Sequence, residues 1–166
     1  MQDHIDFVVD QWRSAMPELD ASSMAIFGRM LRLMKHLAKA RAVALEPFGF
    51  HEGEFDVLAT LRRAGKPYRL SPTQLYTSLL VTSGAMTNRL NRLANEGMIE
   101  RLADPQDGRS MLVGLTRRGV ETIEQAVHVH TETQNALLQG LDSEQQKQLS
   151  ELLKALLVTH PGEATG

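Results

Sequence analysis

The order of short segments between residues 71 and 118 constrains the fold of this chain more than any other feature. Ser71 followed by Pro72 is a typical helix start and predicts a short helix over residues 72–78. After a turn, a second helix is expected from Thr82 or Ser83 to about Glu96, where Gly97 ends it. Two apolar segments then flank a turn-rich stretch and predict the strands of a hairpin, residues 98–102 and 111–115. Helix, turn, helix and hairpin in this order predict a winged helix-turn-helix.

Apolar residues at helical spacing predict five further helices. Three precede this segment: residues 3–16, a long helix to about residue 45 that Asp20 or Ser22 starts, and a helix from His51 or Glu52 to about Arg63. Two follow it: a long helix from Thr116 to about Leu138, and a last helix from Asp142 to about Val158. The expected fold is mainly α with a small β-wing, divided into N-terminal helices (1–47), the winged helix-turn-helix (48–118) and C-terminal helices (119–166).

The composition indicates a globular chain with a sizeable core. Its 166 residues are 42% hydrophobic, and no apolar run approaches the roughly 20 residues that a membrane span needs. The N-terminus has no signal-peptide pattern, so a cytoplasmic location and no membrane partner are expected. The chain has no cysteine, which excludes disulfides, thiolate metal sites and thiol-based redox sensing.

Positive charge is concentrated in the same segment as the helix-turn-helix pattern. The net charge is −2, yet residues 58–118 contain ten Lys and Arg against four Asp and Glu. Residues 1–57 contain six against nine, and residues 119–166 two against seven. A basic segment between acidic flanks is the distribution that a phosphate-binding module needs. A solvated surface of mixed charge is the alternative interpretation.

The second helix of the helix-turn-helix is expected to read DNA. Met86, Leu90 and Leu93 take its core face, so the small and polar residues near its N-terminus are left to approach base edges. The preceding helix is expected to touch phosphate. The DNA contacts expected from these two helices are Thr73, Gln74, Ser83, Gly84, Ala85, Thr87, Asn88 and Arg92.

The turn between the two strands, residues 104–110, is the second expected DNA contact. Gly108 permits a tight turn, and Asp107 can pair with Arg109 and fix its direction. An arginine at the tip of a hairpin can enter a narrow minor groove, where the negative potential is strong. We therefore add Asp107, Arg109 and Ser110 to the expected DNA contacts, with an ordinary charged turn as the alternative.

The terminal helices carry apolar faces that a single small chain has difficulty burying. One face is on the last helix, at Leu149, Leu152, Leu153, Leu156 and Leu157, and another is on the first, at Ile5, Val8, Val9 and Trp12. Packing both ends against a second copy predicts a two-fold homodimer, which would match a palindromic DNA site. An intramolecular core is the alternative.

From about Phe48 to Gly119 the sequence resembles the multiple antibiotic resistance regulator (MarR) family, through the segment NRLNRLANEGMIERLADPQDGRSMLVGLTRRG. The resemblance implies a homodimeric winged-helix protein, usually a repressor, whose affinity for DNA falls when a small molecule binds. The wing arginine of the family corresponds to Arg109, and its aspartate partner to Asp107. The family often has a second arginine beside the first, where this chain has Gly108.

A narrower resemblance, to the urate-responsive branch of the family, reaches the N-terminus through QWRSAMPELD and EFDVLATLRRAGKPYRLSPTQL. It implies that Trp12 and Arg89 hold the urate anion and that Asp56 responds to the charge of the ligand. An indole donor and a guanidinium suit a flat anion. Asp56 and Arg89 both lie beside apolar residues, where a charge is costly unless it is paired or bound to a ligand. A structural ion pair between them, with Trp12 in the core, is the alternative.

Other classes of function find little support in the sequence. We expect no catalytic residues, because there is no phosphate-binding loop, nucleophile elbow or metalloprotease helix motif. We expect no metal site, because the six histidines lack the spacing of metal ligands. The expected partners are double-stranded DNA, a second copy of the chain and a small effector, with urate as the candidate and no cofactor. A regulator of another ligand, such as a phenolic acid, and a DNA-binding or DNA-bridging protein without a ligand stay open.

Overall fold

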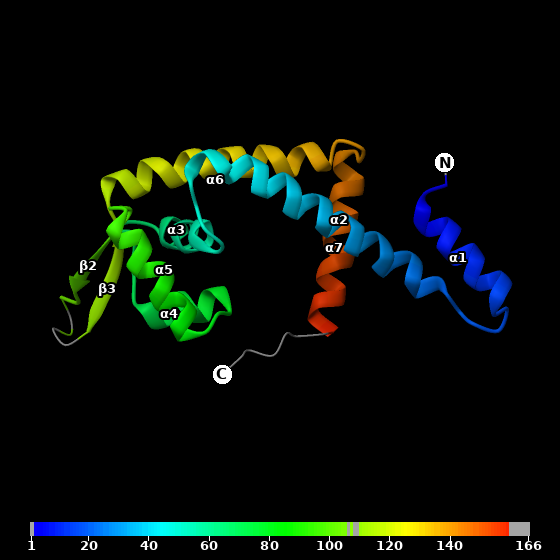
Figure 1. Ribbon diagram of the computed structural model, residues 1–166, viewed down its shortest axis with the longest axis horizontal. Helices are drawn as coiled ribbons and strands as arrows, with labels where there is room; N and C mark the ends of the chain where they lie inside the picture. Colours follow the sequence, from blue (N-terminus) through cyan, green and yellow to red (C-terminus); the bar gives the residue numbers. More distant parts are fainter. Residues whose placement is uncertain (1, 106, 108–109, 160–166) are drawn as a thin grey trace. The chain divides into compact units, whose positions relative to one another are not determined.

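The computed structural model describes residues 2–105, 107 and 110–159 (Figure 1). These residues form two compact units, Met1–Val43 and Ala44–Gly166. The first unit contains helix α1 (His4–Ala15) and most of α2 (Ser22–Leu45). The second contains the remaining elements: η1 (Glu46–Phe48), α3 (Glu54–Arg63), β1 (Arg69–Leu70), α4 (Pro72–Leu79), α5 (Ser83–Asn95), β2 (Ile99–Ala103), β3 (Met111–Leu115), α6 (Arg117–Leu137) and α7 (Ser143–Thr159). The prediction of a mainly α-helical winged helix-turn-helix is confirmed.

Helix α1 is started by a capping box and is held on α2 by a small core. The carboxylate of Asp3 accepts hydrogen bonds from the backbone N–H groups of Ile5 and Asp6, at 2.7 and 3.0 Å, and Asp6 accepts in return from Asp3. Ile5 and Val9 pack with Ala21 of the connecting segment and are 9% and 4% exposed. These two residues therefore fill an intramolecular core, whereas the sequence had placed them on a face left for a second copy.

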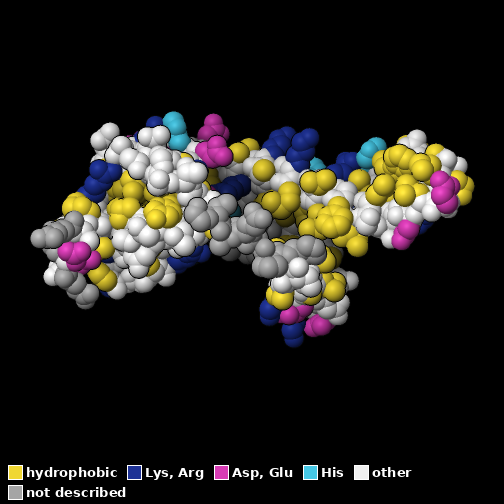
Figure 2. Space-filling view, turned by 90° about the horizontal axis from the view of Figure 1, so that it is seen from below, with side chains coloured by type: hydrophobic (Ala, Val, Ile, Leu, Met, Phe, Trp, Pro, Cys, Tyr) yellow, Lys and Arg dark blue, Asp and Glu magenta, His cyan; other side chains and the backbone are white. Residues whose placement is uncertain are grey.

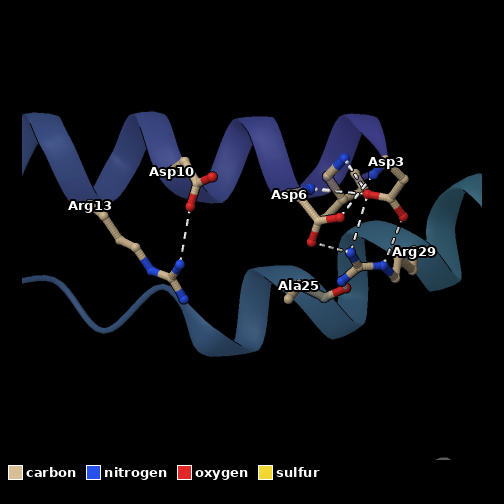
Figure 3. Close-up of polar contacts among 7 residues, drawn as sticks. Asp3, Asp6, Asp10, Arg13, Ala25 and Arg29 are labelled. Atoms are coloured by element: carbon tan, nitrogen blue, oxygen red, sulfur yellow. Dashed lines mark hydrogen bonds and ion pairs between the residues drawn. The ribbon is translucent and has the colours of Figure 1, made fainter. Parts of the chain in front are cut away.

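An arginine on α2 ties the start of α1 to that helix (Figure 3). Nε of Arg29 lies 2.9 Å from Asp3, and its Nη2 lies 2.6 Å from Asp6. The backbone N–H of Asp6 and then Arg29 lower the pKa of Asp3, and the backbone N–H of Asp3 and then Arg29 lower the pKa of Asp6. Because both pKa values are lowered in the folded chain, the stabilisation is present above the ordinary aspartate pKa and is lost as the pH falls through the lowered values.

The second unit has a three-stranded antiparallel sheet in the order β1-β3-β2. Strands β2 and β3 form the predicted wing hairpin, with Ile99 opposite Leu115 and Ala103 opposite Met111. Strand β1 was not expected from the sequence. It has only two residues, too few to show an alternating pattern, and it exists because Leu70 and Arg69 pair with Val113 and Gly114 of β3.

The core of the second unit lies among helices α3, α4, α5 and α6 and the sheet. Its fully buried side chains include Leu58 and Leu61 of α3, Leu75 of α4, Leu93 of α5 and Ile123 of α6. Helix α6 thus joins the core of the winged helix, whereas the sequence predicts a separate C-terminal segment over residues 119–166. Figure 1 shows α6 running on from the wing strands, past α3.

Helix α6 begins in close contact with Gly97 and Met98, in the segment between α5 and β2. Thr116 caps it by accepting from the backbone N–H of Gly119 at 3.0 Å, and its hydroxyl donates to the carbonyl of Gly97 at 2.7 Å. A Cβ at Gly119 would overlap the carbonyl oxygen of Met98. The backbone can approach this closely only because residue 119 has no side chain.

We predict that Gly119→Ala lowers the free energy of unfolding by roughly 1–3 kcal/mol, because the added methyl group meets a backbone atom that has no room to move. Gly84, in the first turn of α5, is the matched control, because a Cβ there meets nothing within 4 Å. Gly84→Ala should be neutral or stabilising by up to about 1 kcal/mol. Urea denaturation followed by circular dichroism measures both, and equal effects of the two substitutions would contradict the prediction.

Candidate DNA interface and effector residues

The helix-turn-helix is formed by α4 and α5, each with its own N-terminal cap. At α4, Ser71 accepts from the backbone N–H of Gln74 at 3.1 Å, and the side chain of Gln74 accepts from Ser71 at 2.8 Å. The turn passes through Leu80, whose φ of 52° is left-handed, and Thr82 then caps α5 by accepting from Ala85. Two capped helices and one left-handed residue thus fix the geometry of this motif.

Helix α5 buries one side and exposes the other. Met86, Leu90 and Leu93 are 1%, 3% and 0% exposed, as their helical spacing predicts. Most of the residues expected to contact DNA lie on the exposed part of α4 and α5, at Thr73, Gln74, Ser83, Gly84, Thr87 and Asn88, while Ala85 is half-buried. The placement leaves these side chains accessible to a duplex, and their contacts with DNA stay predictions.

The wing turn is partly described. Ser110 donates from its hydroxyl to the Asp107 carboxylate at 2.7 Å and from its backbone N–H to the Asp107 carbonyl at 2.8 Å. Asp104 closes the turn by donating its backbone N–H to the carbonyl of Ser110. Gly108 and Arg109 lie outside the described residues, so the expected pair between Asp107 and Arg109 stays a prediction. What the structure describes is an Asp107–Ser110 link across the base of the turn.

Arg92 is held by carboxylates on two elements. Its Nε lies 2.7 Å from the carboxylate of Glu54, at the start of α3, and its Nη2 lies 2.8 Å from Glu96, the C-terminal cap of α5. Nη2 also donates to the carbonyl of Gly49 at 3.4 Å. The sequence placed Arg92 among the DNA contacts because it lies off the apolar face of α5, and it gave no sign of Glu54, which is 38 residues away. The guanidinium is turned toward α3, and a contact of Arg92 with DNA stays a prediction.

Other arginines of the basic segment are also paired. Arg62 bonds Glu124 of α6 at 2.7 Å and lies over the ring of Tyr68, and Arg117 bonds Glu121 at 2.8 Å. Their partners belong to the acidic flanks of the sequence. Part of the positive charge that residues 58–118 carry is therefore neutralised within the fold, and the charge count alone overstates what is left for phosphate.

The wing is tied to the exposed side of α5 by a bond that the sequence did not predict. Nη2 of Arg101, on β2, donates to the side-chain carbonyl of Asn91, on α5, at 2.6 Å. Asn91 is one helical turn from Thr87 on the same side of the helix. The only signal in the sequence is that two polar residues lie on adjacent elements, which does not identify a pair.

The three residues implied as ligands by the resemblance are divided between the two units. Trp12 lies on α1 in the first unit and is 40% exposed. Asp56 on α3 and Arg89 on α5 belong to the second unit and are half-buried. The Arg89 guanidinium lies against Gly53, the cap of α3, where an added Cβ would overlap it. Helix α5, the expected recognition helix, therefore touches the start of α3 through Arg89. The point of contact, Gly53, is three residues before Asp56.

Gly53 also explains why α3 begins later than expected. Its φ of 77° is left-handed, which interrupts the helix that the sequence started at His51 or Glu52. The backbone N–H of His51 instead donates to the buried Glu54 at 2.7 Å.

Among residues 2–105, 107 and 110–159 there is no cluster of three or more His, Cys, Asp or Glu able to hold a metal ion. Within the same residues, no helix is both long enough and apolar enough to cross a bilayer.

A capped helix-turn-helix with an exposed polar reading face and a wing defines a DNA-binding transcription regulator, and comparison with known proteins agrees. Residues 48–110 match the MarR family. The transcriptional regulator PecS of Dickeya dadantii is 34% identical over 146 residues, which cover 88% of both chains. The multiple antibiotic resistance protein MarR of Escherichia coli is 34% identical over 114 residues, 68% of this chain and 77% of that one. The chain belongs to the MarR family.

Solved structures of the family have the same fold. A cysteine-to-serine mutant of E. coli MarR in complex with operator DNA matches 88% of this chain and 97% of that one, with a TM-score of 0.68 and 28% identity. AbsC from Streptomyces coelicolor, at 20% identity and a TM-score of 0.77, shares the fold over 87% of this chain and 98% of its own. The relatives are transcription regulators, in agreement with the expectation that this chain is not an enzyme.

Proposed function

We propose that this protein is a cytoplasmic homodimeric repressor that leaves a palindromic operator when a planar anion, with urate as the candidate, binds to it. The main support for this proposal is the contact of Arg89 with Gly53. This contact puts Arg89, a candidate ligand residue on α5, against the start of α3, the helix that contains Asp56. A ligand that draws the Arg89 guanidinium away from Gly53 acts directly on α5. Such a ligand couples an effector site to the reading face through one movable element.

Repression is supported by the name of one relative. The transcriptional repressor YetL of Bacillus subtilis is 29% identical over 144 residues, 84% of this chain and 86% of that protein. Urate is supported by the sequence resemblance that assigns Trp12, Asp56 and Arg89 to the ligand. A guanidinium and an indole N–H also suit other flat anions, and a phenolic acid is the second candidate.

The homodimer is supported by apolar side chains that each unit leaves exposed (Figure 2). Helix α2 exposes Ile26, Phe27, Leu31, Leu33 and Met34, between 48% and 73%, and α7 exposes Leu152, Leu156, Leu157 and Val158, between 44% and 71%. Exposed apolar surface on this scale marks a protein interaction site. A second copy with two-fold symmetry buries equivalent faces of both chains and presents two reading helices to a palindrome.

Leu157→Glu should convert the protein to a monomer in size-exclusion chromatography with light scattering, because it places a charge in the proposed interface. Leu157 is 70% exposed within the chain, so the fold of the monomer should not change. Lys147→Glu, an exposed position on the side of the same helix opposite Leu149, Leu152 and Leu156, is the control and should stay dimeric. A monomeric wild-type protein, or a dimeric Leu157→Glu variant, would contradict the assignment of α7 to the interface.

Arg109→Ala should weaken binding to a DNA duplex selected by the wild-type protein by roughly 1–3 kcal/mol, because the arginine is expected to enter the minor groove. Fluorescence anisotropy with the labelled duplex measures the change. Arg13→Ala removes one guanidinium from an exposed ion pair on α1 and should bind like the wild type. Wild-type affinity in Arg109→Ala would remove this residue from the DNA interface.

Arg89→Ala should weaken urate binding by roughly tenfold or more, measured by isothermal titration calorimetry, with the protein still dimeric. Arg101→Ala is the matched control, since Arg101 also contacts α5 but on the side of Asn91. Micromolar binding of urate to the wild type, with one or two sites per dimer, supports the proposal. If the wild type gives no heat with urate, the effector is another molecule and a structural ion pair becomes the better explanation of Asp56 and Arg89.

A further inference from the structure

A buried carboxylate at the start of α3 is bonded to the recognition helix. Glu54 is 1% exposed, and its two oxygens are both used: one accepts from the backbone N–H of His51 at 2.7 Å, and the other accepts from Nε of Arg92 at 2.7 Å. Burial of a carboxylate is costly unless it is paired and hydrogen-bonded, and both conditions are met here. Glu54 is buried and the side chain of Arg92 is 36% exposed, so the two form a partly buried link between α3 and α5.

The contribution of such a link is geometric more than energetic. A buried ion pair often contributes no more to stability than apolar side chains of the same size, because the cost of desolvation offsets the attraction. Its bonds are directional, however, while apolar packing is not. Met86, Leu90 and Leu93 hold α5 on the core through non-directional contacts, and the bonds of Arg92 add a directional restraint on its rotation.

Rotation of α5 matters because its two sides have different tasks. Ser83, Thr87 and Asn88 are exposed on the side away from the core, and they meet base edges only if the helix presents them at the right angle. The arginine is fixed at three points: Glu96 at the C-terminal cap of α5, and Glu54 and the carbonyl of Gly49, which belong to other segments. Arg92 thus links α5 to Gly49, between η1 and α3, and to Glu54, the first residue of α3.

We infer that Arg92 is a positioning residue, which sets the rotation of the recognition helix through Glu54 and so supports sequence-specific DNA binding without touching DNA. Glu54 acts with it as the fixed point on α3. This role replaces the direct contact that the sequence suggested for Arg92. It does not depend on the identity of the effector, because it concerns the DNA-bound state of the ligand-free protein.

Glu54→Gln and Glu96→Gln form the matched pair that tests this role. Each removes one carboxylate from the same guanidinium, but only Glu54 lies on another helix. Two labelled duplexes are used: one selected by the wild-type protein from a random-sequence library, and a scrambled duplex of the same length and composition. Anisotropy titrations over a range of salt concentrations give the affinity for each duplex and the number of phosphate contacts.

Glu54→Gln should lower the affinity for the selected duplex by roughly tenfold or more, the scale of a misplaced base contact, and should leave the scrambled duplex within about twofold. The salt dependence should be unchanged, because no phosphate contact is lost. Glu96→Gln should stay within about twofold of the wild type on both duplexes. Removal of a negative charge by itself strengthens DNA binding, so a selective loss in Glu54→Gln cannot arise from charge alone.

Arg92→Lys and Arg92→Met provide a second route if Glu54→Gln does not fold. If Arg92 positions α5, both variants should lose affinity for the selected duplex but not for the scrambled one. The salt dependence of binding should be unchanged. All titrations are made below the onset of thermal unfolding of each variant. An equal loss on both duplexes, with a salt slope lower by about one phosphate contact, would show that Arg92 binds DNA directly. Tighter or unchanged binding by Glu54→Gln, or equal losses in Glu54→Gln and Glu96→Gln, would also overturn the role.

Discussion

Burial of the apolar face of α5 against α3 and α4 is the constraint on which the rest of the second unit depends. Leu58, Leu61, Leu75 and Leu93 are completely buried, and each comes from a helix too short to be stable by itself. Because the same helix must bury one side and read DNA with the other, its packing decides which residues are available for recognition. The caps at Ser71 and Thr82 and the left-handed Leu80 then determine where α5 begins.

The first unit is built on a different balance of forces. Its core consists of Ile5, Val9 and Ala21 with the partly buried Met24 and Ala25, and polar bonds between Arg29, Asp3 and Asp6 add to it at the exposed edge. Exposed ion pairs contribute little to stability, and a core of this size buries little apolar surface. Large apolar side chains of α2 meanwhile remain exposed. The unit is therefore suited to association, which gives the proposed dimer its physical basis.

Arginine has a different use at each position around the recognition helix. Arg92 is bonded to the buried Glu54, Arg89 lies against Gly53, and Arg101 is bonded to Asn91 across to the wing. The planar guanidinium suits these uses, since it donates hydrogen bonds in several fixed directions. Part of the positive charge of the segment thus organises the DNA-binding surface, and the remainder is left to attract the duplex.

The sequence by itself determined the order of the helices, the caps at Ser71, Thr82 and Thr116, and the wing hairpin, because helical periodicity, capping residues and turn residues act over a few neighbouring positions. It also determined the buried face of α5, from the spacing of Met86, Leu90 and Leu93. Only the tertiary structure decided that Arg92 faces Glu54, that Ile5 and Val9 are internal, and that the two residues of β1 form a third strand. Each of these depends on a partner far away in the chain, and neither the distance nor the direction to such a partner is encoded in local residue patterns.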